Sequence, residues 1–394
     1  MPDDIFLAGA NRTAIAGFHG SFADTPATVL GSAVIRAALQ RSGIPAEMVD
    51  EVIFGNVVSA GLGQNPARQA AIGAGLPIST GSTTVNKVCG SGLKAVMLAA
   101  QAVACGDADI VAAGGMENMT RAPYLLEKAR SGYRLGNAEM IDALMRDGLA
   151  DAYQNVPMGE FGDRTAARYG FTREQQDDYA IESHQRARVA IDAGMFAGEI
   201  TPVEVRDGKE MRQIAQDEQP RRFNEEKLRR LRPVFGTDGT ITAGNASSIN
   251  DAAAAVIVAS GAKLKELGVA PQARVLGYAS AAREPEWFAL APIHALRKLM
   301  AKLSLAVGDV DLFEINEAFA VAPMAAMRDL EIPRARVNVH GGAIALGHPI
   351  GASGTRTLVT LLHAMKERRA KIGITTLCIG GGEAVAMAVE NLER

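Results

Sequence analysis

The sequence predicts an α/β protein built from two related halves, with a long insertion in the first half. Short apolar runs typical of strands alternate with helix-like stretches at both ends of the chain, whereas the middle is densely charged and its apolar runs are short. The last third also repeats features of the first third in the same order. Alternation of this kind predicts a parallel sheet covered by helices on both faces.

The change in character sets the predicted domain boundaries. Residues 1–118 together with 248–270 form the first half, residues 119–247 the insertion, and residues 271–394 the second half. Apolar spacing and glycine stops predict strands over Asp4–Ala10, Val49–Val57 and Ala108–Gly115 and helices over Thr28–Ser42 and Leu93–Ala104. Further along, they predict one long amphipathic helix over Arg173–Ala193 and strands over Asn250–Ser260 and Ala273–Ser280.

Two short matches support an internal duplication. Val49-Asp50 leads into a predicted strand in the first half, as Val310-Asp311 does in the second. Ser91-Gly92 opens a predicted helix that a glycine-ended strand follows, as Ser353-Gly354 does ahead of Gly373–Gly382. Matches this short also arise by chance, but their common order favours duplication.

Composition and charge exclude several function classes. The chain has 394 residues, of which 48% are hydrophobic and 22% charged, and its net charge of −3 gives no general reason to bind nucleic acid or an anionic membrane. No uninterrupted apolar run predicts a membrane span, the acidic start is unlike a secretory leader, and the last residues are unlike a peroxisomal signal. Three cysteines argue against a disulfide framework, so we expect a reducing, cytoplasmic setting.

Cys89 is the first candidate for chemistry. It lies in VNKVCGSGLKAV, Val85–Val96, between a strand-like run and an apolar helix. The free N–H groups and positive dipole end of a helix N-terminus favour a thiolate, and Gly90 and Gly92 would let a ligand approach the backbone. A small buried thiol is an equally good interpretation of this segment alone. Cys105, at the far end of the same helix, is expected to be structural filler.

His348 is the second candidate. It lies in the glycine-rich GGAIALGHPIGASG, Gly341–Gly354, a predicted loop that feeds a helix. Pro349 fixes its own φ and restricts His348, so the imidazole has a defined direction. The segment lacks the Gly-Lys-Ser/Thr ending of a phosphate loop, which favours a catalytic loop over a nucleotide loop.

Two more candidates follow strands. Cys378, in TTLCIGGGEA, lies near the end of an apolar strand, and the glycines Gly380–Gly382 after it expose backbone N–H groups that could hold a carbonyl oxygen. Taken alone, this cysteine is more simply core filler. Asn316, in EINEAFA, either caps a helix or positions a water or carbonyl.

All four candidates lie at or just beyond the carboxyl end of a predicted strand, where open parallel sheets bind ligands. Two thiols, an imidazole and backbone donors can run a Claisen condensation without a metal or redox cofactor: one thiolate takes an acyl group and a second base forms the enolate that attacks it. Zinc held by Cys89, His348 and Cys378 is the alternative, but the closely spaced ligand pairs of structural zinc sites are missing.

The segments NKVCGSGLKAV, NEAFA, GGAIALGHPIGASG and CIGGG, in this order and at these separations, resemble the thiolase family, and similarity extends over nearly the whole chain, including AGNASSINDAAAA. The resemblance implies two βαβαβαββ halves in a five-layer αβαβα sandwich, with an inserted loop domain that holds coenzyme A. It is closest to the biosynthetic branch, acetyl-CoA C-acetyltransferase. A broader degradative 3-ketoacyl-CoA thiolase is the first alternative, and a coenzyme A carrier with little turnover is the second.

The resemblance also implies roles for the candidates. Cys89 would carry the acyl group, activated by His348, and Cys378 would remove or return the α-proton. One oxyanion hole would combine His348 with Asn316 acting through a water. The other would combine the backbone N–H groups of Cys89 and Gly380.

Substrate contacts and assembly follow from the same resemblance. The substrates would be acetyl-CoA, acetoacetyl-CoA and CoA, with no other cofactor and no metal. The chain would form a homotetramer, a dimer of dimers, with part of Arg121–Ala150 as its tetramerisation loop. The residues that match coenzyme A or acyl contacts are Met158, Arg221, Phe235, Ala243, Ser247, Phe288, Ala318 and Phe319. Pro157 replaces the histidine that many biosynthetic members carry before the methionine, which favours the degradative alternative.

Overall fold

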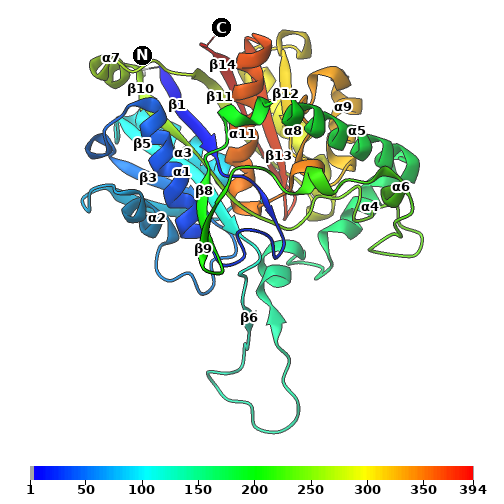
Figure 1. The fold of residues 1–394 in the computed structure, drawn as a ribbon. Helices are drawn as coiled ribbons and strands as arrows, with labels where there is room; N and C mark the ends of the chain where they lie inside the picture. Colours follow the sequence, from blue (N-terminus) through cyan, green and yellow to red (C-terminus); the bar gives the residue numbers. More distant parts are fainter. Residues whose placement is uncertain (1–3, 394) are drawn as a thin grey trace.

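The computed structural model describes residues 4–393, with Asp207 described by its backbone alone; residues 1–3 and 394, at the outer ends of the first and last predicted domains, lie outside the described residues. Figure 1 shows two α/β halves side by side, the first in blue and cyan and the second in yellow to red. The green insertion crosses the front of both. One segment of the insertion, Tyr124 to Asp142 (the arm), extends away from the body.

The two halves have matching element orders. The first contains β1 (Ile5–Arg12), α1 (Ala27–Ser42), β3 (Glu51–Gly55), α2 (Pro66–Ala74), β4 (Gly81–Val85), α3 (Ser91–Cys105), β5 (Ile110–Asn118) and β10 (Asn250–Ser260). The second contains β11 (Ala273–Ala282), α8 (Ala291–Leu303), β12 (Leu312–Ile315), α9 (Val321–Leu330), α10 (Ala343–Leu346), α11 (Ile350–Arg368), β13 (Ile372–Ile379) and β14 (Glu383–Asn391).

The insertion and connections hold the remaining helices and strands. These are β2 (Ala16–Gly17), β6 (Tyr124–Leu125), β7 (Ile141–Asp142), α4 (Met158–Tyr169), α5 (Arg173–Asp192), β8 (Val203–Asp207), β9 (Glu210–Ile214), α6 (Glu225–Arg229) and α7 (Gly261–Leu267). The predicted strand Asn250–Ser260 matches β10, and the other predicted strands and helices match within a few residues. The predicted loop Gly341–Gly354 is instead largely helical, because it contains α10 and the first residues of α11. Strand β4 corresponds to the strand-like run placed before Cys89, whose bounds were not predicted because β4 is largely polar and lies at an edge of the sheet. Helix α2 was not predicted.

The sheet is mixed, so the prediction of a parallel sheet is wrong in part. Strands β3, β4 and β5 are parallel, and so are β12 and β13. β14 is antiparallel because it leaves β13 through the short glycine turn, and β10 pairs antiparallel with β5 and β1. The two half-sheets join through a short antiparallel pairing of β1 with β11.

Helices divide the protein into five layers. α1 and α2 cover the outer face of the first half-sheet, and α8 and α9 cover that of the second. α3 and α11 pack against each other and against strands of both halves, so they form the middle layer. This arrangement confirms the αβαβα architecture.

The duplication is visible in hydrogen bonds. The Asp50 carboxylate accepts the backbone N–H of Ile110 at 2.9 Å, and the Asp311 carboxylate accepts that of Ile372, also at 2.9 Å. Each aspartate therefore ties the start of one strand to the start of its parallel neighbour. The second half differs in its third strand, which is reduced to a single bridge between Phe313 and Val337.

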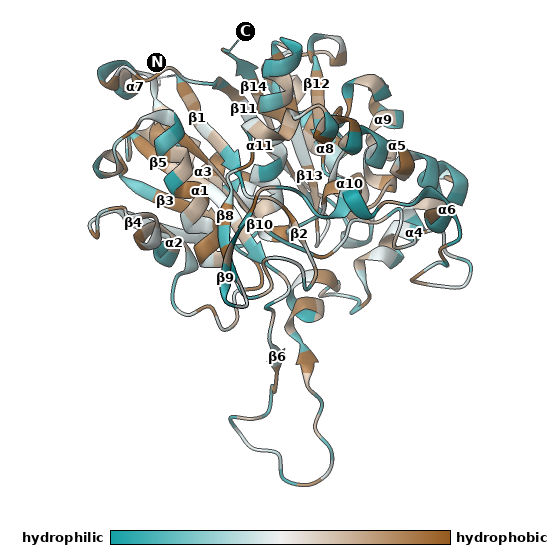
Figure 2. Ribbon diagram, viewed as in Figure 1, coloured by the Kyte–Doolittle hydropathy of each residue, from teal (hydrophilic) through white to brown (hydrophobic). Residues whose placement is uncertain are grey.

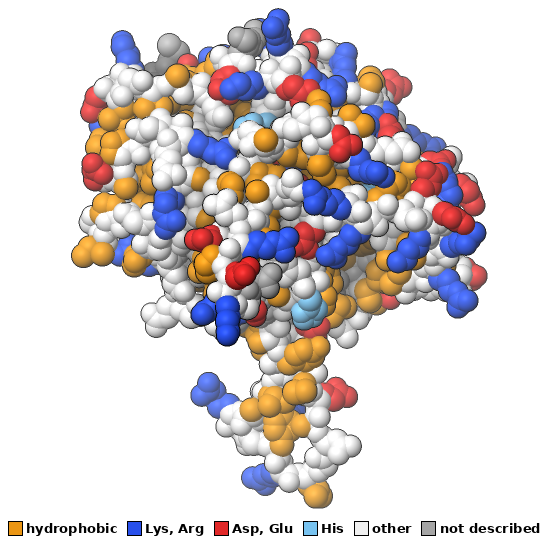
Figure 3. Space-filling view, in the orientation of Figure 1, with side chains coloured by type: hydrophobic (Ala, Val, Ile, Leu, Met, Phe, Trp, Pro, Cys, Tyr) orange, Lys and Arg blue, Asp and Glu red, His pale blue; other side chains and the backbone are white. Residues whose placement is uncertain are grey.

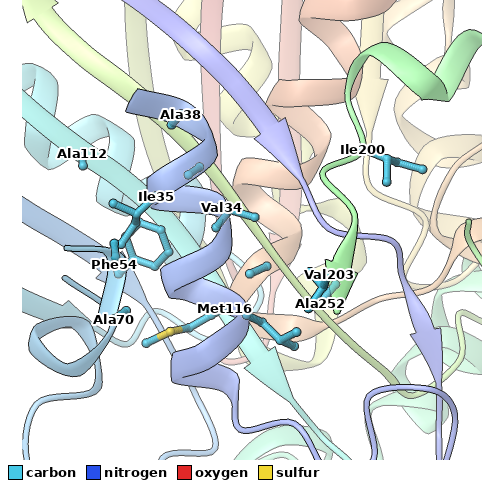
Figure 4. Close-up of a cluster of buried hydrophobic side chains, with 14 of the residues drawn as sticks. Val34, Ile35, Ala38, Phe54, Ala70, Ala112, Met116, Ile200, Val203 and Ala252 are labelled. Carbon is cyan, nitrogen blue, oxygen red and sulfur yellow. The ribbon is translucent and has the colours of Figure 1, made fainter. Parts of the chain in front are cut away.

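Apolar side chains fill the spaces between layers, and Figure 2 shows the hydrophobic residues concentrated on the inner strands and helices. In the outer core of the first half, Ile35 of α1 lies beside Phe54, while Val34 lies on the other side of the helix, toward Val203 of the insertion (Figure 4). One helix, Val88–Cys105, is long and apolar enough to span a membrane by length and composition alone. It contains the central helix α3, most of whose apolar residues are buried between the half-sheets.

A buried charged cluster fixes the insertion to the first half. The Arg12 guanidinium donates to both carboxylate oxygens of Asp217, at 2.7 and 2.8 Å, and to Glu199 at 2.5 Å. All three side chains are almost inaccessible to solvent. Thr360 of α11 also donates to Glu199, so the cluster links strand β1, the insertion and the central layer.

Candidate active site

The five residues predicted to act on substrate lie in four segments at one end of the half-sheets. Cys89 precedes α3 and His348 precedes α11. Asn316 follows β12, Cys378 is the second-last residue of strand β13, and Gly380 follows that strand. A mostly apolar pocket of about 260 Å³ is lined by Cys89, His348 and Gly380, among others. Asn316 and Cys378 are not part of this lining but lie directly behind it, Asn316 against His348 and Cys378 in a cluster with the lining residues Phe288 and Ala318.

A strained turn presents Cys89. Val88 has a φ of +45°, which is unusual for a β-branched residue. The Ser91 hydroxyl donates to the Val88 carbonyl at 2.6 Å and accepts the Lys87 N–H at 2.8 Å, which holds the turn against the start of α3. A Cβ at Gly90 would lie 2.4 Å from the terminal methyl group of Ile379, so a larger residue here would require the Ile379 side chain to move.

Two backbone N–H groups interact with the Cys89 thiol, those of Gly380 and of Cys89 itself. Although the side chain is partly accessible from the pocket, the dense protein around it raises the pKa of the thiol to about 11, against the two N–H groups that lower it. The resting group is therefore a thiol. The expectation that the helix N-terminus makes it a thiolate is wrong for the empty site, because desolvation outweighs the dipole.

One contact with a hydroxyl group and one with a side-chain amide orient the His348 imidazole. The Ser353 hydroxyl lies 2.5 Å from Nδ1 and donates to the Pro349 carbonyl at 2.8 Å. Its free lone pair can then accept Nδ1–H, which leaves the lone pair of Nε2 facing the pocket, 3.4 Å from the Asn316 amide nitrogen. Burial, followed by the charge of Arg356, lowers the pKa of His348 to about 3, so the imidazole is neutral and able to accept a proton.

Asn316 does not cap a helix, since α9 begins only at Val321. Its backbone N–H donates to Thr376 at 3.0 Å, and its side chain turns toward His348. Its Oδ1 is buried and has no hydrogen-bond partner among residues 4–393. A buried amide oxygen without a partner fits a site that a water or a substrate group completes.

Cys378 lies deeper than Cys89. Its side chain is fully buried in an apolar cluster with Phe161, Phe288 and Ala318. Burial, and secondarily the neighbouring Cys89, raises the pKa of the Cys378 thiol well above its ordinary value. Once deprotonated, such a thiolate would be a strong base.

The predicted acyl and coenzyme A contacts divide into two groups. Those that line the pocket are Met158, Phe235, Ser247, Phe288, Ala318 and Phe319. Ser247 donates to the Ala318 carbonyl at 3.0 Å, which closes the wall between the insertion and the second half. Arg221 and Ala243 are exposed and lie outside the pocket lining, and Arg221 instead hydrogen-bonds Gln216.

Two buried carboxylates that the sequence analysis did not assign support these loops. Glu117, at the end of β5, accepts the backbone N–H groups of Val57 at 3.0 Å and Gly351 at 2.9 Å, and burial raises its pKa to about 7. Glu317 accepts the hydroxyls of Tyr179 and Ser183 at 2.8 and 2.7 Å. The position of each glutamate after a strand was the only available signal, because their partners are distant in sequence.

One further expectation is corrected. Cys105 is exposed at the end of α3 and fills no core. In the described part of the chain, no three His, Cys, Asp or Glu side chains are arranged to hold a metal ion, which gives no support to the alternative of zinc held by Cys89, His348 and Cys378.

Comparison with known proteins gives consistent matches over the whole chain. Residues 5–262 match the model of the thiolase N-terminal domain, and residues 269–391 match that of the thiolase C-terminal domain. The chain is 52% identical to the acetyl-CoA acetyltransferase of Pseudomonas aeruginosa, over 98% of this chain and 99% of the relative. It is 50% identical to that of Allochromatium vinosum over the full length of both.

Solved structures agree with the sequence matches. The acetyl-CoA acetyltransferase of Bacillus anthracis superposes with a TM-score of 0.97, at 38% identity and 99% coverage of both chains. A thiolase from Ascaris suum in complex with coenzyme A superposes with a TM-score of 0.94, at 43% identity, covering 99% of this chain and 100% of the other.

We expect Ser353→Ala to slow alkylation of Cys89 by iodoacetamide about tenfold at pH 8. The substitution removes the partner of His348 Nδ1, so the imidazole loses its orientation toward the thiol. Thr357→Val, which removes another buried hydroxyl one turn along α11, is the control and should leave the rate unchanged. Equal rates in the two variants would contradict the role given to Ser353.

The raised pKa of Cys89 makes its reactivity depend on pH in a defined way. With a pKa of about 11, the thiolate fraction rises about tenfold per pH unit, so alkylation followed on the Cys89 peptide by mass spectrometry should still accelerate between pH 9 and 10. The folded chain keeps this proton above the pH at which the unfolded chain loses it. This group therefore lowers the free energy of unfolding as the pH rises from about 8.5 toward 11. A rate that levels off below pH 9 would contradict the assignment.

Proposed function

The chain belongs to the thiolase family, and we propose that it is an acetyl-CoA C-acetyltransferase, which condenses two acetyl-CoA molecules reversibly to acetoacetyl-CoA and CoA. The observation that carries this proposal is the thiol of Cys89 under two backbone N–H groups, with a second thiol and an oriented imidazole beside the same pocket. The names of the relatives support the substrate and the acyltransferase activity.

In the first half-reaction, the Cys89 sulfur attacks the thioester carbonyl carbon while its proton passes to Nε2 of His348. The carbonyl oxygen becomes an oxyanion that the N–H groups of Cys89 and Gly380 stabilise. The bond from carbon to the coenzyme A sulfur then breaks, and Cys378 donates its proton to that sulfur. The products are acetyl-Cys89, an imidazolium, a Cys378 thiolate and free CoA.

In the second half-reaction, the Cys378 thiolate removes an α-proton from the second acetyl-CoA. The enolate oxygen is stabilised by the imidazolium N–H of His348 and by a water held by Asn316. The enolate carbon attacks the acetyl carbon, and the bond to the Cys89 sulfur breaks. That sulfur takes back the proton from His348, so all three groups return to their starting states. Every proton is carried by the chain, which supports a reaction with CoA thioesters as substrates and no further cofactor.

A broader degradative 3-ketoacyl-CoA thiolase is the second candidate, because the pocket wall carries a proline at position 157. Pro157 precedes α4, next to Met158, where it offers no hydrogen-bond donor to a substrate. A coenzyme A carrier is a third candidate. It would bind CoA without turnover in a steady-state thiolysis assay on acetoacetyl-CoA.

The setting and assembly are also part of the proposal. Three free cysteines in the described chain support a reducing compartment, the cytoplasm. The arm supports a homotetramer: Leu135, Met140 and Tyr124 are exposed by 101%, 68% and 63%, and Figure 3 shows apolar side chains along its surface. Exposed apolar residues on a projecting segment fit contact with a second copy of the chain.

Substitution of the two thiols separates the half-reactions. Cys89→Ala should form no acetyl-enzyme with acetyl-CoA, as measured by intact mass. Cys378→Ala should still acylate slowly, but α-proton exchange and condensation should fall by about 10²- to 10⁴-fold because the base is lost. Near-normal condensation in Cys378→Ala would mean that another group is the base.

Phe288 sets the depth expected for the acyl pocket. It is 3% exposed, lines the pocket and packs edge-to-face on Phe319 with ring centroids 6.1 Å apart. Phe288→Leu should raise kcat/KM for C6 and C8 3-ketoacyl-CoA at least about tenfold relative to acetoacetyl-CoA, because the smaller side chain frees volume beside Cys378. Trp287→Leu, which lies outside the pocket lining, is the control. A wild type already fast on C8 would favour the degradative candidate.

Acidic substitutions test whether the arm forms part of the tetramer interface. Leu135→Glu combined with Met140→Glu should convert a tetramer to a dimer in light scattering, since burying two carboxylates in an apolar contact is costly. Met211→Glu, at an exposed position on the β8–β9 hairpin, is the control and should leave the mass unchanged. A tetramer that survives the double substitution would remove the arm from the interface.

A further inference from the structure

The two backbone donors that face Cys89 come from separate loops, and an ion pair joins those loops outside the pocket. Lys87, two residues before Cys89, pairs with Glu383, which follows the glycine turn Gly380–Gly382. Neither side chain lines the pocket. We propose that the Lys87–Glu383 pair is a positioning pair, which holds the N–H groups of Gly380 and Cys89 at the separation that acyl transfer to Cys89 requires. The inference rests on the function proposed above.

On the side of the nucleophile, Lys87 is rigidly connected to Cys89. Its backbone N–H donates to the Ser91 hydroxyl at 2.8 Å, and its carbonyl accepts the Gly90 N–H at 3.0 Å. The strained Val88 lies between Lys87 and Cys89. A displacement of Lys87 would therefore also displace the hydrogen-bonded turn that carries the Cys89 sulfur.

On the other side, the first two residues of the glycine turn, Gly380 and Gly381, are loosely packed. Gly382 is held, since a Cβ on it would lie 2.4 Å from the Arg283 carbonyl oxygen and its own carbonyl accepts the Arg283 N–H at 2.8 Å. A Cβ built on Gly380 would meet only ordinary contacts, 3.6 Å from Val88 and 3.9 Å from Met158, and one on Gly381 would meet nothing within 4 Å. Gly381 and Gly382 have φ values of +88° and +86°. Glycine backbones have wide conformational freedom, so steric contact alone leaves the Gly380 N–H less constrained than the turn that holds Cys89.

Glu383 supplies the missing restraint. It begins β14 and pairs with Ile379 of β13 and Ala282 of β11, so its backbone belongs to the sheet. Its carboxylate reaches across to Lys87. Burial, followed by the charge of Lys87, lowers the pKa of Lys94 of α3, and the nearby Glu383 carboxylate opposes this shift. The carboxylate thus fastens the far end of the glycine turn to the loop of the nucleophile.

The pair is poorly placed to stabilise the fold as a whole. The Lys87 and Glu383 side chains are 24% and 38% exposed, and ion pairs this close to solvent contribute little to the free energy of unfolding. Its effect should therefore appear at the oxyanion site, where donor position determines rate steeply.

The effect should also be selective for one half-reaction. The N–H groups of Cys89 and Gly380 lie next to the Cys89 sulfur, where they would face the carbonyl of an acyl group on that sulfur. The enolate oxygen is instead assigned to His348, which precedes α11, and Asn316, which follows β12. Neither side chain is bonded to Lys87 or Glu383. Loosening the pair should slow acylation and leave α-proton removal unchanged.

The test uses Lys87→Met, Glu383→Gln and the reversed double variant Lys87→Glu with Glu383→Lys. Lys366→Met removes an exposed lysine paired with Glu393 at the end of α11 and is the matched control. Acylation is measured at saturating acetyl-CoA by rapid quench and intact mass. α-Proton exchange is measured on preformed acetyl-enzyme, and thermal unfolding on the free protein.

Each single variant should acylate about fivefold more slowly, with unchanged exchange and melting temperature, and the reversed pair should recover to within about twofold. Wild-type acylation should also slow as salt is raised to about 0.5 M, whereas the single variants should be insensitive. The proposal is overturned if single variants acylate at the wild-type rate, if the reversed pair fails to recover, or if exchange and melting temperature fall together with acylation. A wild type that forms no acetyl-enzyme overturns the proposed function instead.

Discussion

The close contact between the first turns of α3 and α11 places a sulfur and an imidazole in one pocket. A Cβ on Gly92 would lie 2.7 Å from the Thr355 hydroxyl, and one on Gly354 would lie 2.3 Å from the backbone nitrogen of Leu93. Larger residues would push the helices apart. Because each helix begins just after the loop that carries Cys89 or His348, the distance between the helices sets the distance between the reacting groups.

Desolvation is the dominant electrostatic effect in this pocket. It raises the thiol pKa of Cys89 and Cys378 and lowers the pKa of His348, so the empty site holds neutral groups. Neutral groups cost less to bury than an ion pair, and they become charged only when a substrate brings a developing oxyanion or a leaving sulfur. Backbone N–H groups carry no net charge, so they can be buried in such a site without the desolvation cost of an ion.

The sequence predicted the architecture and the four loops, because both depend on local patterns. Apolar alternation and glycine stops locate β10 and α5 within a residue or two, and a cysteine or histidine among glycines marks a chemical loop. The partners of those loops were not predictable. Ser353 is close in sequence to His348 but gives no signal of its own, and Glu383 lies almost 300 residues from Lys87. The thiolate expectation for Cys89 failed because a helix terminus can be seen in sequence, whereas burial cannot.

The internal duplication has a consequence for how the site could arise. Ser91 and Ser353 occupy equivalent places, and each hydroxyl holds the loop that precedes its helix. In a symmetric pair of identical chains, the two loops would carry the same residues, so a loop with a thiol would face another loop with a thiol. Once both copies are joined in one polypeptide, each loop is encoded separately, so a substitution in one loop no longer changes the other. A thiol in one half can then evolve opposite an imidazole in the other half.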